Sequence, residues 1–458
     1  MTDTVYHLVG SGGIGMSAIA RLLLARGVRV SGSDVRRTPL LDRLEREGMR
    51  VAIGHDAANV AGADVVVVSS AIALDNPELV AALEGQIEVV TRGKMLARLA
   101  EGHKLVAVAG THGKTTTTAM LATIFEAAGL DPTVAVGGIR VDSGTNARAG
   151  SGTWFVTESD ESDGSFLELQ PTIAVVNNIE NDHIASDAEL PRLLSQFATF
   201  VSKVPPQGRA VIGTDNPASA LLASEARAAT STFATRANAQ LTASGIEYEN
   251  LGSRFTVCEI GSELGTVELN VPGEINVQNA LAAIGAARAA GIGFAATARA
   301  LGAFHGVERR FQIVGRGALT IVNDYAHHPT AILQTIAAAR AFADGAPVIV
   351  AFQPHRYTRT QYLQTAFAAA LASADRVFLT PIYAASEDPI PGVSARSIGE
   401  PLAAGGTPVT YVDDVEALLD EVPRDVPAGA LVLMLGAGSI SGVAHRLGER
   451  ISAAPLVR

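Results

Sequence analysis

Short apolar runs rich in β-branched residues alternate with alanine- and leucine-rich stretches along most of this 458-residue chain. The runs include VRVSGSD, ADVVVVSSA, KLVAVAG, TIAVVNN, ALTIVND, PVIVAFQP, RVFLTP and ALVLMLGAG. Because strands that alternate with helices assemble into parallel sheets with crossover helices, the pattern predicts an α/β fold. At three places, near residues 10, 110 and 436, an apolar run enters a glycine-rich turn followed by a helical pattern. We therefore expect three α/β domains.

The length agrees with several domains, since single cores stop growing near about 250–300 residues. Polar residues separate apolar runs at EGHK (101–104) and FHGVERRF (304–311), which suggests boundaries there. One stretch, 241–273, departs from the alternating pattern and predicts antiparallel strands appended to the middle domain. The predicted domains are 1–102, 103–306 and 307–458.

The composition of the chain limits the kinds of molecule that it can bind and the places where it can act. The formal net charge of -11 argues against nucleic acid or an anionic membrane as the main partner, so we expect small-molecule substrates. The one cysteine, Cys258, excludes an internal disulfide and is expected to be a small buried side chain. No apolar run approaches the ~18 residues of a membrane span, and no targeting segment is visible. We expect a cytoplasmic monomer or weak homodimer.

The segment VYHLVGSGGIG places Gly10, Gly12 and Gly15 in the G-x-G-x-x-G spacing directly after an apolar run. Such a turn lets the backbone approach a pyrophosphate at the N-terminus of the next helix. Asp34 closes the second apolar run, where an acidic side chain would meet a ribose. Because any phosphorylated nucleotide can use this turn, a nicotinamide cofactor stays one alternative.

A second glycine turn, AGTHGKTTTT, resembles a phosphate-binding P-loop. Val108 stands where the first glycine of G-x-x-x-x-G-K-[ST] belongs, so the loop is a compressed variant. It still supplies backbone N–H groups, the charge of Lys114 and the hydroxyl of Thr115 for Mg²⁺. The segment predicts an ATP site.

Carboxylates cluster after two later apolar runs, in ESDESD and NIENDH. Because carboxylates crowded at the ends of parallel strands repel one another, a nearby cation is the natural compensation. Together with the phosphate loop they favour a Mg²⁺-ATP site. The residues are Glu158, Asp160, Glu161 and Asp163, followed by Glu180, Asp182 and His183.

The motifs AGTHGKTTTT, ESDESDGSF, NIENDH, PGEINVQNALAA, DYAHHPTAI and FQPHRYTRT occur in this order, and together they resemble those of the Mur ligases. The resemblance extends from HLVGSGGIGMS to LMLGAGSIS and is strongest to the branch that adds L-alanine. It implies a Rossmann-like N-terminal domain for a UDP-sugar, a central P-loop ATPase-type domain and a Rossmann-like C-terminal domain for the amino acid. The implied reaction is ATP-dependent ligation of L-alanine to the lactyl carboxylate of UDP-N-acetylmuramate through an acyl phosphate, in peptidoglycan synthesis.

The resemblance also implies roles for individual residues. Lys114, His183 and Arg359 are expected to be catalytic, and two Mg²⁺ ions are expected at Thr115, Glu158 and His183. The expected ATP contacts are Gly110, Thr111, His112, Gly113, Lys114, Thr115, Thr116, Asn279, Arg310 and Asp324. The expected substrate contacts are Gly12, Gly13, Ile14, Ser70, Tyr325, His327, Arg356 and Arg359; Ser70 could equally just end a strand.

The chain departs from the family pattern at three positions. Ala198 occupies the place of a lysine that several sister ligases carbamylate, Ile275 replaces a usual histidine in PGEIN, and Ala185 replaces a frequent aspartate. Three alternatives stay open: a ligase that recycles a murein tripeptide onto the same nucleotide sugar, an NAD-dependent oxidoreductase, and a non-catalytic nucleotide sensor.

Overall fold

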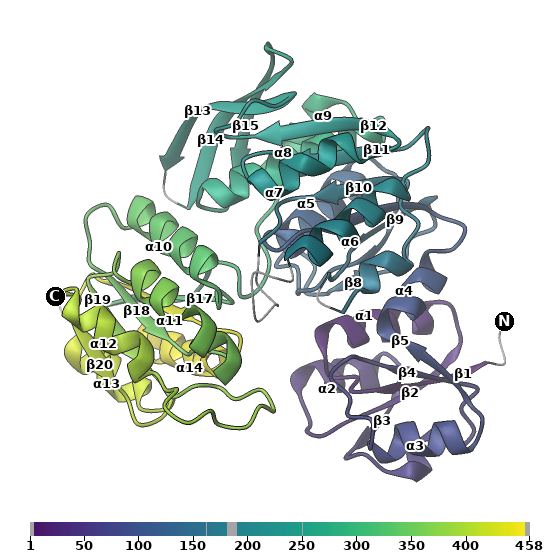
Figure 1. The fold of residues 1–458 in the computed structure, drawn as a ribbon, viewed down its shortest axis with the longest axis horizontal. Helices are drawn as coiled ribbons and strands as arrows, with labels where there is room; N and C mark the ends of the chain where they lie inside the picture. Colours follow the sequence, from purple (N-terminus) through teal and green to yellow (C-terminus); the bar gives the residue numbers. More distant parts are fainter. Residues whose placement is uncertain (1–3, 162, 181–189, 250, 454–458) are drawn as a thin grey trace.

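The computed structural model describes residues 4–161, 163–180, 190–249 and 251–453. These residues form three sheets, one in each of three successive parts of the chain, coloured purple, teal and green to yellow in Figure 1. The predicted three-domain α/β fold is confirmed. The boundaries at residues 102 and 306 stay predictions.

The N-terminal sheet is parallel, in the order β3-β2-β1-β4-β5. Its strands are β1 (Val5–Val9), β2 (Arg29–Asp34), β3 (Arg50–Ile53), β4 (Val65–Val68) and β5 (Glu88–Thr91). The helical segments are α1 (Ile14–Ala25), α2 (Pro39–Arg46), η1 (Ala57–Val60), α3 (Pro77–Glu84) and α4 (Arg92–Ala100). The chain adds β2 and β3 on one side of β1 and then β4 and β5 on the other. The glycine turn between β1 and α1 therefore lies at the switch point of the strand order, where parallel sheets of this kind bind ligands.

The middle sheet runs β15-β14-β13-β12-β11-β10-β6-β9-β7-β8. Its strands are β6 (Lys104–Ala109), β7 (Thr133–Ala135), β8 (Ala147–Arg148), β9 (Trp154–Glu158), β10 (Ile173–Val176), β11 (Arg209–Gly213), β12 (Ala229–Ala234), β13 (Leu241–Glu249), β14 (Gly252–Glu259) and β15 (Ser262–Leu269). The strands from β13 to β15 pair antiparallel, as predicted for 241–273. Its helical segments are α5 (Lys114–Ala127), η2 (Ser165–Glu168), α6 (Leu190–Ser202), α7 (Pro217–Ala220), η4 (Leu221–Ser224), α8 (Glu274–Ala289) and α9 (Phe294–Gly302).

The C-terminal sheet runs β16-β17-β21-β18-β19-β20 and is parallel except for β16. Its strands are β16 (Gln312–Arg316), β17 (Thr320–Asp324), β18 (Val348–Phe352), β19 (Arg376–Leu379), β20 (Val409–Tyr411) and β21 (Leu431–Leu435). The helices are α10 (Pro329–Ala343), α11 (Tyr357–Leu371), α12 (Arg396–Ala404), α13 (Leu418–Asp425) and α14 (Ile440–Ala453). Pro329 opens α10, where its fixed φ and missing N–H suit a helix start.

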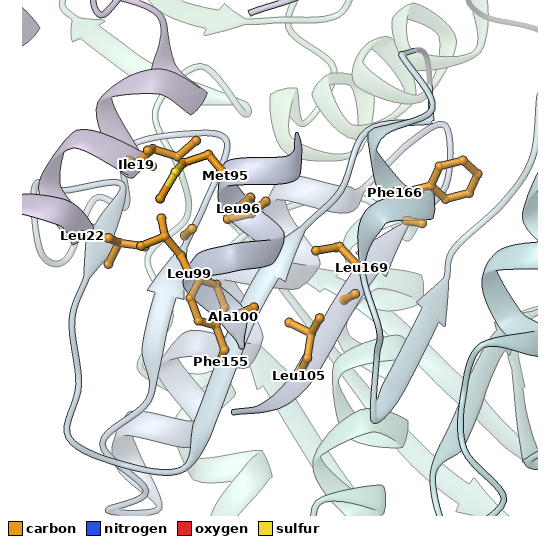
Figure 2. Packing of buried hydrophobic residues seen from close by; sticks show 14 of the residues in the cluster. Ile19, Leu22, Met95, Leu96, Leu99, Ala100, Leu105, Phe155, Phe166 and Leu169 are labelled. Atoms are coloured by element: carbon orange, nitrogen blue, oxygen red, sulfur yellow. The ribbon is translucent and has the colours of Figure 1, made fainter. Parts of the chain in front are cut away.

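One apolar core joins the N-terminal and middle sheets. Ile19 and Leu22 of α1 and Leu99 of α4 belong to the same buried cluster as Leu105 of β6 and Phe155 of β9 (Figure 2). The buried clusters of the C-terminal part contain residues from 319 onward, with the partly buried Phe311 packed against them, and they include no residue of the middle part. Hydrophobic burial therefore ties the first two parts together more firmly than it ties the third.

A polar contact adds to the joint between the first two parts. The fully buried side chain of Asn146, in the middle part, donates to the Ile14 carbonyl at 2.7 Å and to Ser17 Oγ at 3.0 Å. Both acceptors lie in the first turn of α1, so the helix N-terminus that follows the glycine turn is fixed against the middle domain.

Two further expectations concern exposure. Cys258 lies on β14 and is half-buried, so the expectation of a buried side chain is wrong. None of the described helices is long and apolar enough to cross a membrane.

The buried carboxylate of Glu78 lies against β1 and β2 of the N-terminal sheet. Glu78, in the first turn of α3, is fully buried and contacts Ser33, Asn59 and His55, with His7 Nε2 at 3.7 Å. Burial alone would raise the pKa of Glu78, but its contacts with His7, Ser33 and Asn59 outweigh burial and lower the pKa to about 2.

We expect this carboxylate to make stability depend on pH. Since the folded pKa lies below the ordinary 4.5, the stabilisation is complete above about pH 4.5 and is lost as pH falls toward about 2. The full effect is about 3 kcal/mol, at about 1.4 kcal/mol per pH unit. Urea unfolding of Glu78→Gln and the parent protein at several pH values should show their stability difference shrinking through this window. A difference independent of pH would contradict the prediction.

Candidate active site

A cavity of about 660 Å³ is lined by all three parts of the chain. It joins the N-terminal glycine turn, the phosphate loop and the start of α10. The predicted site residues that line it are Gly12, Ile14, Thr111, His112, Gly113, Lys114, Thr115, Thr116, Glu158, Asn279, Arg310, Asp324, Tyr325 and His327. Gly13, Ser70, Gly110, Arg356 and Arg359 are not among its lining residues.

The phosphate loop leads from β6 into α5. Gly110 and Gly113 adopt φ of 123° and 82°, a region that favours glycine. A Cβ on Gly113 would lie 2.1 Å from Asn279 Oδ1, so the loop packs directly on the α8 side chain below it. Val108 lies within β6 and is fully buried, which explains why the compressed loop needs no glycine there.

Lys114, the first residue of α5, lies at the centre of this loop. Its Nζ donates to the Gly110 carbonyl at 2.7 Å and to Glu161 Oε2 at 2.8 Å. Burial lowers the pKa of Lys114, but the charges of Glu161 and Asp160 outweigh it and raise the pKa above its usual value. The ammonium group is therefore kept charged beside the loop's backbone N–H groups.

The side-chain oxygens of Thr115 and Glu158 lie next to each other beside the loop. Thr115 Oγ1 donates to Glu158 Oε2 at 2.7 Å, and a Cβ on Gly137 would lie 1.5 Å from Glu158 Oε1, so the carboxylate fills a cradle that only glycine leaves open. Burial raises the pKa of Glu158. A hydroxyl beside a half-buried carboxylate is the donor set that a hard cation such as Mg²⁺ prefers, so these residues fit the predicted metal. The third predicted ligand, His183, lies outside the described residues.

Asn279, Arg310 and Asp324 also line the cavity. Asn279 Oδ1 accepts from Thr117 at 3.2 Å beneath the phosphate loop. The Asp324 carboxylate ends β17 and accepts the N–H groups of Phe311 at 2.6 Å and Ala326 at 2.7 Å, while burial raises its pKa. These bonds hold the ends of β16 and β17 together at the cavity wall.

The N-terminal glycine turn contacts Asp34, the acidic residue that ends β2. Asp34 Oδ2 accepts the Gly12 N–H at 2.9 Å, and a Cβ on Gly12 would lie 2.7 Å from the same oxygen. Arg92, at the start of α4, also lines the cavity and pairs with Asp163 at 3.0 Å. Sequence reasoning missed Arg92, since it lies outside every motif. Ser70 is exposed in the turn after β4.

On the C-terminal side, rings connect the cavity wall to Arg359. Tyr325 lies 4.9 Å from His327, whose ring lies 5.9 Å from that of His355. Arg359 Nη1 lies 3.3 Å from His355 Nδ1, so Arg359 is one residue behind the wall. Burial, and then the charges of Arg359 and Arg356, lower the pKa of His355 to about 4. His355 is a residue that the sequence analysis missed, although it precedes Arg356 in the FQPHRYTRT motif.

Two consecutive arginines that precede β16 also lie against the Tyr325 ring. The guanidinium carbons of Arg309 and Arg310 are 4.6 and 5.1 Å from its centroid. Such cation–π contacts fix the ring at the cavity wall.

A second polar cluster joins the middle and C-terminal parts. Glu180 Oε2 accepts from Thr330 Oγ1 at 2.7 Å and lies 3.1 Å from His112 Nε2 and 3.9 Å from His328 Nδ1. The hydrogen bonds from His112 and Thr330 outweigh burial and lower the pKa of Glu180. The ligating atoms of His112, Glu180 and His328 lie within 4.8 Å of one another, so this group could also hold a metal ion.

Models of one protein family match the three parts in order. The model described as "Mur ligase family, catalytic domain" matches residues 5–104, "Mur ligase middle domain" matches 108–287, and "Mur ligase, glutamate ligase domain" matches 309–438.

Individual proteins agree with these matches. The chain is 47% identical to UDP-N-acetylmuramate--L-alanine ligase of Acidithiobacillus ferrooxidans, with 96% of each chain covered. The crystal structure of the UDP-N-acetylmuramate-alanine ligase of Thermotoga maritima superposes with a TM-score of 0.84 at 29% identity, covering 97% of this chain and 98% of that one. A murein peptide ligase of Psychrobacter arcticus has a TM-score of 0.75 at 24% identity, covering 99% and 100%, and shares the fold.

Proposed function

The chain belongs to the Mur ligase family, and we propose that it joins L-alanine to the lactyl carboxylate of UDP-N-acetylmuramate at the expense of ATP. One observation carries the proposal: a single cavity is lined by a pyrophosphate-type glycine turn, a phosphate loop and the His-His-Pro turn, each from a different domain. A reaction with three substrates needs such a meeting point. Family membership displaces the oxidoreductase alternative, and the glycine turn serves a uridine diphosphate.

In the first step, a lactyl carboxylate oxygen attacks the γ-phosphorus of ATP, the bond to the β,γ-bridging oxygen breaks, and ADP leaves. Two anions must meet for this to happen, so the site has to neutralise charge as it moves. Lys114 supplies a fixed positive charge at the loop, after exchanging its contact with Glu161 for phosphate oxygens. The N–H groups at the start of α5 bind the same oxygens.

In the second step, the L-alanine amine attacks the carbonyl carbon of the acyl phosphate, loses a proton, and phosphate leaves with the C–O bond electrons. Tyr325 and His327 line the wall on this side, and Arg359 stands behind them. We assign recognition of the alanine carboxylate to Arg359, since a planar guanidinium can donate two parallel hydrogen bonds.

Thr115 and Glu158 would hold Mg²⁺ through their side-chain oxygens, with His183 assigned to a second ion. Bound there, Mg²⁺ would supply positive charge to the transferring phosphoryl group. The 2.7 Å approach of the two oxygens supports the assignment.

The test is direct. The protein is mixed with Mg²⁺-ATP, UDP-N-acetylmuramate and one acceptor at a time, and phosphate release is measured together with product mass. We expect L-alanine to be used far better than an alanyl-headed tripeptide, because the tripeptide places its carboxylates far from the attacking amine. A preference for the tripeptide would make the recycling ligase the better assignment, and phosphate release indifferent to acceptor would favour a nucleotide sensor.

Arg359→Lys should weaken the binding of L-alanine specifically. The variant keeps the charge and loses the two-point donor, so the apparent affinity for L-alanine should fall by about 1–3 kcal/mol, while those for ATP and the nucleotide sugar change little. Steady-state kinetics with each substrate varied in turn measure this. Arg340→Lys, which alters an exposed pair with Asp375, is the matched control. If the substitution weakened the binding of ATP and left the binding of L-alanine unchanged, Arg359 would be assigned to binding the phosphates instead.

A further inference from the structure

We propose that Glu180 is a positioning residue that couples the phosphate loop to the C-terminal domain, so that the acceptor side of the cavity is held over the ATP phosphates during turnover. The inference rests on the proposed function. It assigns a role to a carboxylate that touches neither the Thr115–Glu158 pair nor Lys114 in the hydrogen bonds described above.

Glu180 is attached to the phosphate loop twice. Its backbone N–H donates to Thr111 Oγ1 at 2.8 Å, and Thr111 Oγ1 lies 3.2 Å from its carbonyl oxygen. Its side chain contacts His112, whose own N–H is bound by Asn178 Oδ1 at 2.8 Å. A displacement of Glu180 would therefore be felt by the residues that lead into Gly113 and Lys114.

The same carboxylate reaches the other domain. Thr330 and His328 flank Pro329, the first residue of α10, and Glu180 Oε2 lies 2.7 Å from the Thr330 hydroxyl oxygen. His327, on the cavity wall, is the neighbour of His328. Figure 1 shows α10 on the side of the C-terminal part that faces the middle part. One side chain thus connects the loop that binds phosphates to the turn that carries the acceptor wall.

Packing explains why a polar connection matters at this place. The buried apolar clusters of the C-terminal domain begin at residue 319 and include no residue of the middle domain, whereas one buried cluster contains both Leu99 of the first domain and Leu105 of the second. The C-terminal domain is consequently the part whose position depends most on specific contacts. Misplacing reacting groups by about 1 Å can cost roughly 10²-fold in rate.

The experiment measures kinetics and binding on the full-length protein. Glu180→Ala should lower kcat at least ten-fold and raise the KM for L-alanine, while the affinity for UDP-N-acetylmuramate, measured by calorimetry without ATP, stays as in the parent. Glu180→Gln, which keeps an acceptor oxygen for Thr330, should recover part of the loss. Thr330→Val removes the hydroxyl that contacts Glu180 and keeps nearly the same side-chain shape. Like Glu180→Ala, it should lower kcat and raise the KM for L-alanine.

The double variant Glu180→Ala/Thr330→Val should be no slower than Glu180→Ala alone, because both substitutions break one interaction. Glu259→Gln, which alters a half-buried pair with Arg288 inside the middle domain, is the matched control and should behave like the parent. A role confined to stability would lower the melting temperature without raising the KM for L-alanine.

The proposal is overturned if the single effects add, or if Glu180→Ala and Thr330→Val both match Glu259→Gln. Should Glu180→Ala fail to fold, Thr330→Val and Glu180→Gln still decide the matter. A parent protein that forms no UDP-N-acetylmuramoyl-L-alanine would defeat the proposed function instead, so the two failures are distinguishable.

Discussion

Lys114→Ala should lower kcat by about 10²–10³-fold, the range found when a single preorganised donor is removed from a developing charge, which corresponds to about 2.7–4 kcal/mol. The side chain is the ammonium group of the phosphate loop, and Glu161 and Asp160 keep it protonated. Its loss leaves the γ-phosphoryl group without that charge as the lactyl oxygen attacks. The phosphate-release assay with saturating substrates measures the effect.

Stability has to be separated from catalysis in this experiment. Glu161 is 3% exposed, and removing its partner leaves a buried charge unpaired, which costs roughly 3–5 kcal/mol. The double variant Lys114→Ala/Glu161→Gln removes both charges, so it should regain most of the stability and remain as slow as Lys114→Ala. Near-normal turnover in either variant would show that the phosphate loop takes no part in the catalytic step.

Local patterns in the sequence were enough to predict the layers of the fold. Apolar runs such as KLVAVAG and ALVLMLGAG are buried central strands, β6 and β21, because a strand covered on both faces must be apolar throughout. The antiparallel addition from β13 to β15 was visible as a break in the pattern. The continuity of the core across Leu99 and Leu105 was not, since two amphipathic surfaces do not reveal in sequence that they face each other.

The site residues likewise fall into those that the sequence could place and those whose contacts it could not predict. Residues inside a motif, such as Lys114 and Thr115, could be placed because the loop's geometry is local. Glu161, His355 and Arg92 could not be given their contacts, because each meets its partner through the tertiary arrangement. Glu180 was noticed as one of a group of carboxylates, but its contact with Thr330 spans 150 positions of the chain. The comparisons support the family and its reaction; the roles of single residues stay predictions.

Gly113→Ala should reduce kcat/KM for ATP by at least about 10²-fold. Gly113 has φ of 82°, which costs an L-residue roughly 1–2 kcal/mol. The larger effect is steric, because the new methyl group would lie 2.1 Å from Asn279 Oδ1 and 2.8 Å from Asn177 Nδ2. Both amides are held by hydrogen bonds to Thr117, so the loop must move instead, and it carries Lys114 with it. Steady-state kinetics with ATP varied, and calorimetric titration of ATP, measure the loss.

The other end of α5 provides the matched control. Gly129 has φ of 71°, and a Cβ there would meet nothing within 4 Å. Gly129→Ala therefore incurs the same backbone cost without a clash, and it should lose about 1 kcal/mol of stability while keeping kcat/KM for ATP. The comparison isolates the contact with Asn279 from the strain of a positive φ. If the two variants used ATP equally well, the close packing of Gly113 on α8 would have no part in binding the phosphates, and the placement of ATP at this loop would have to be abandoned.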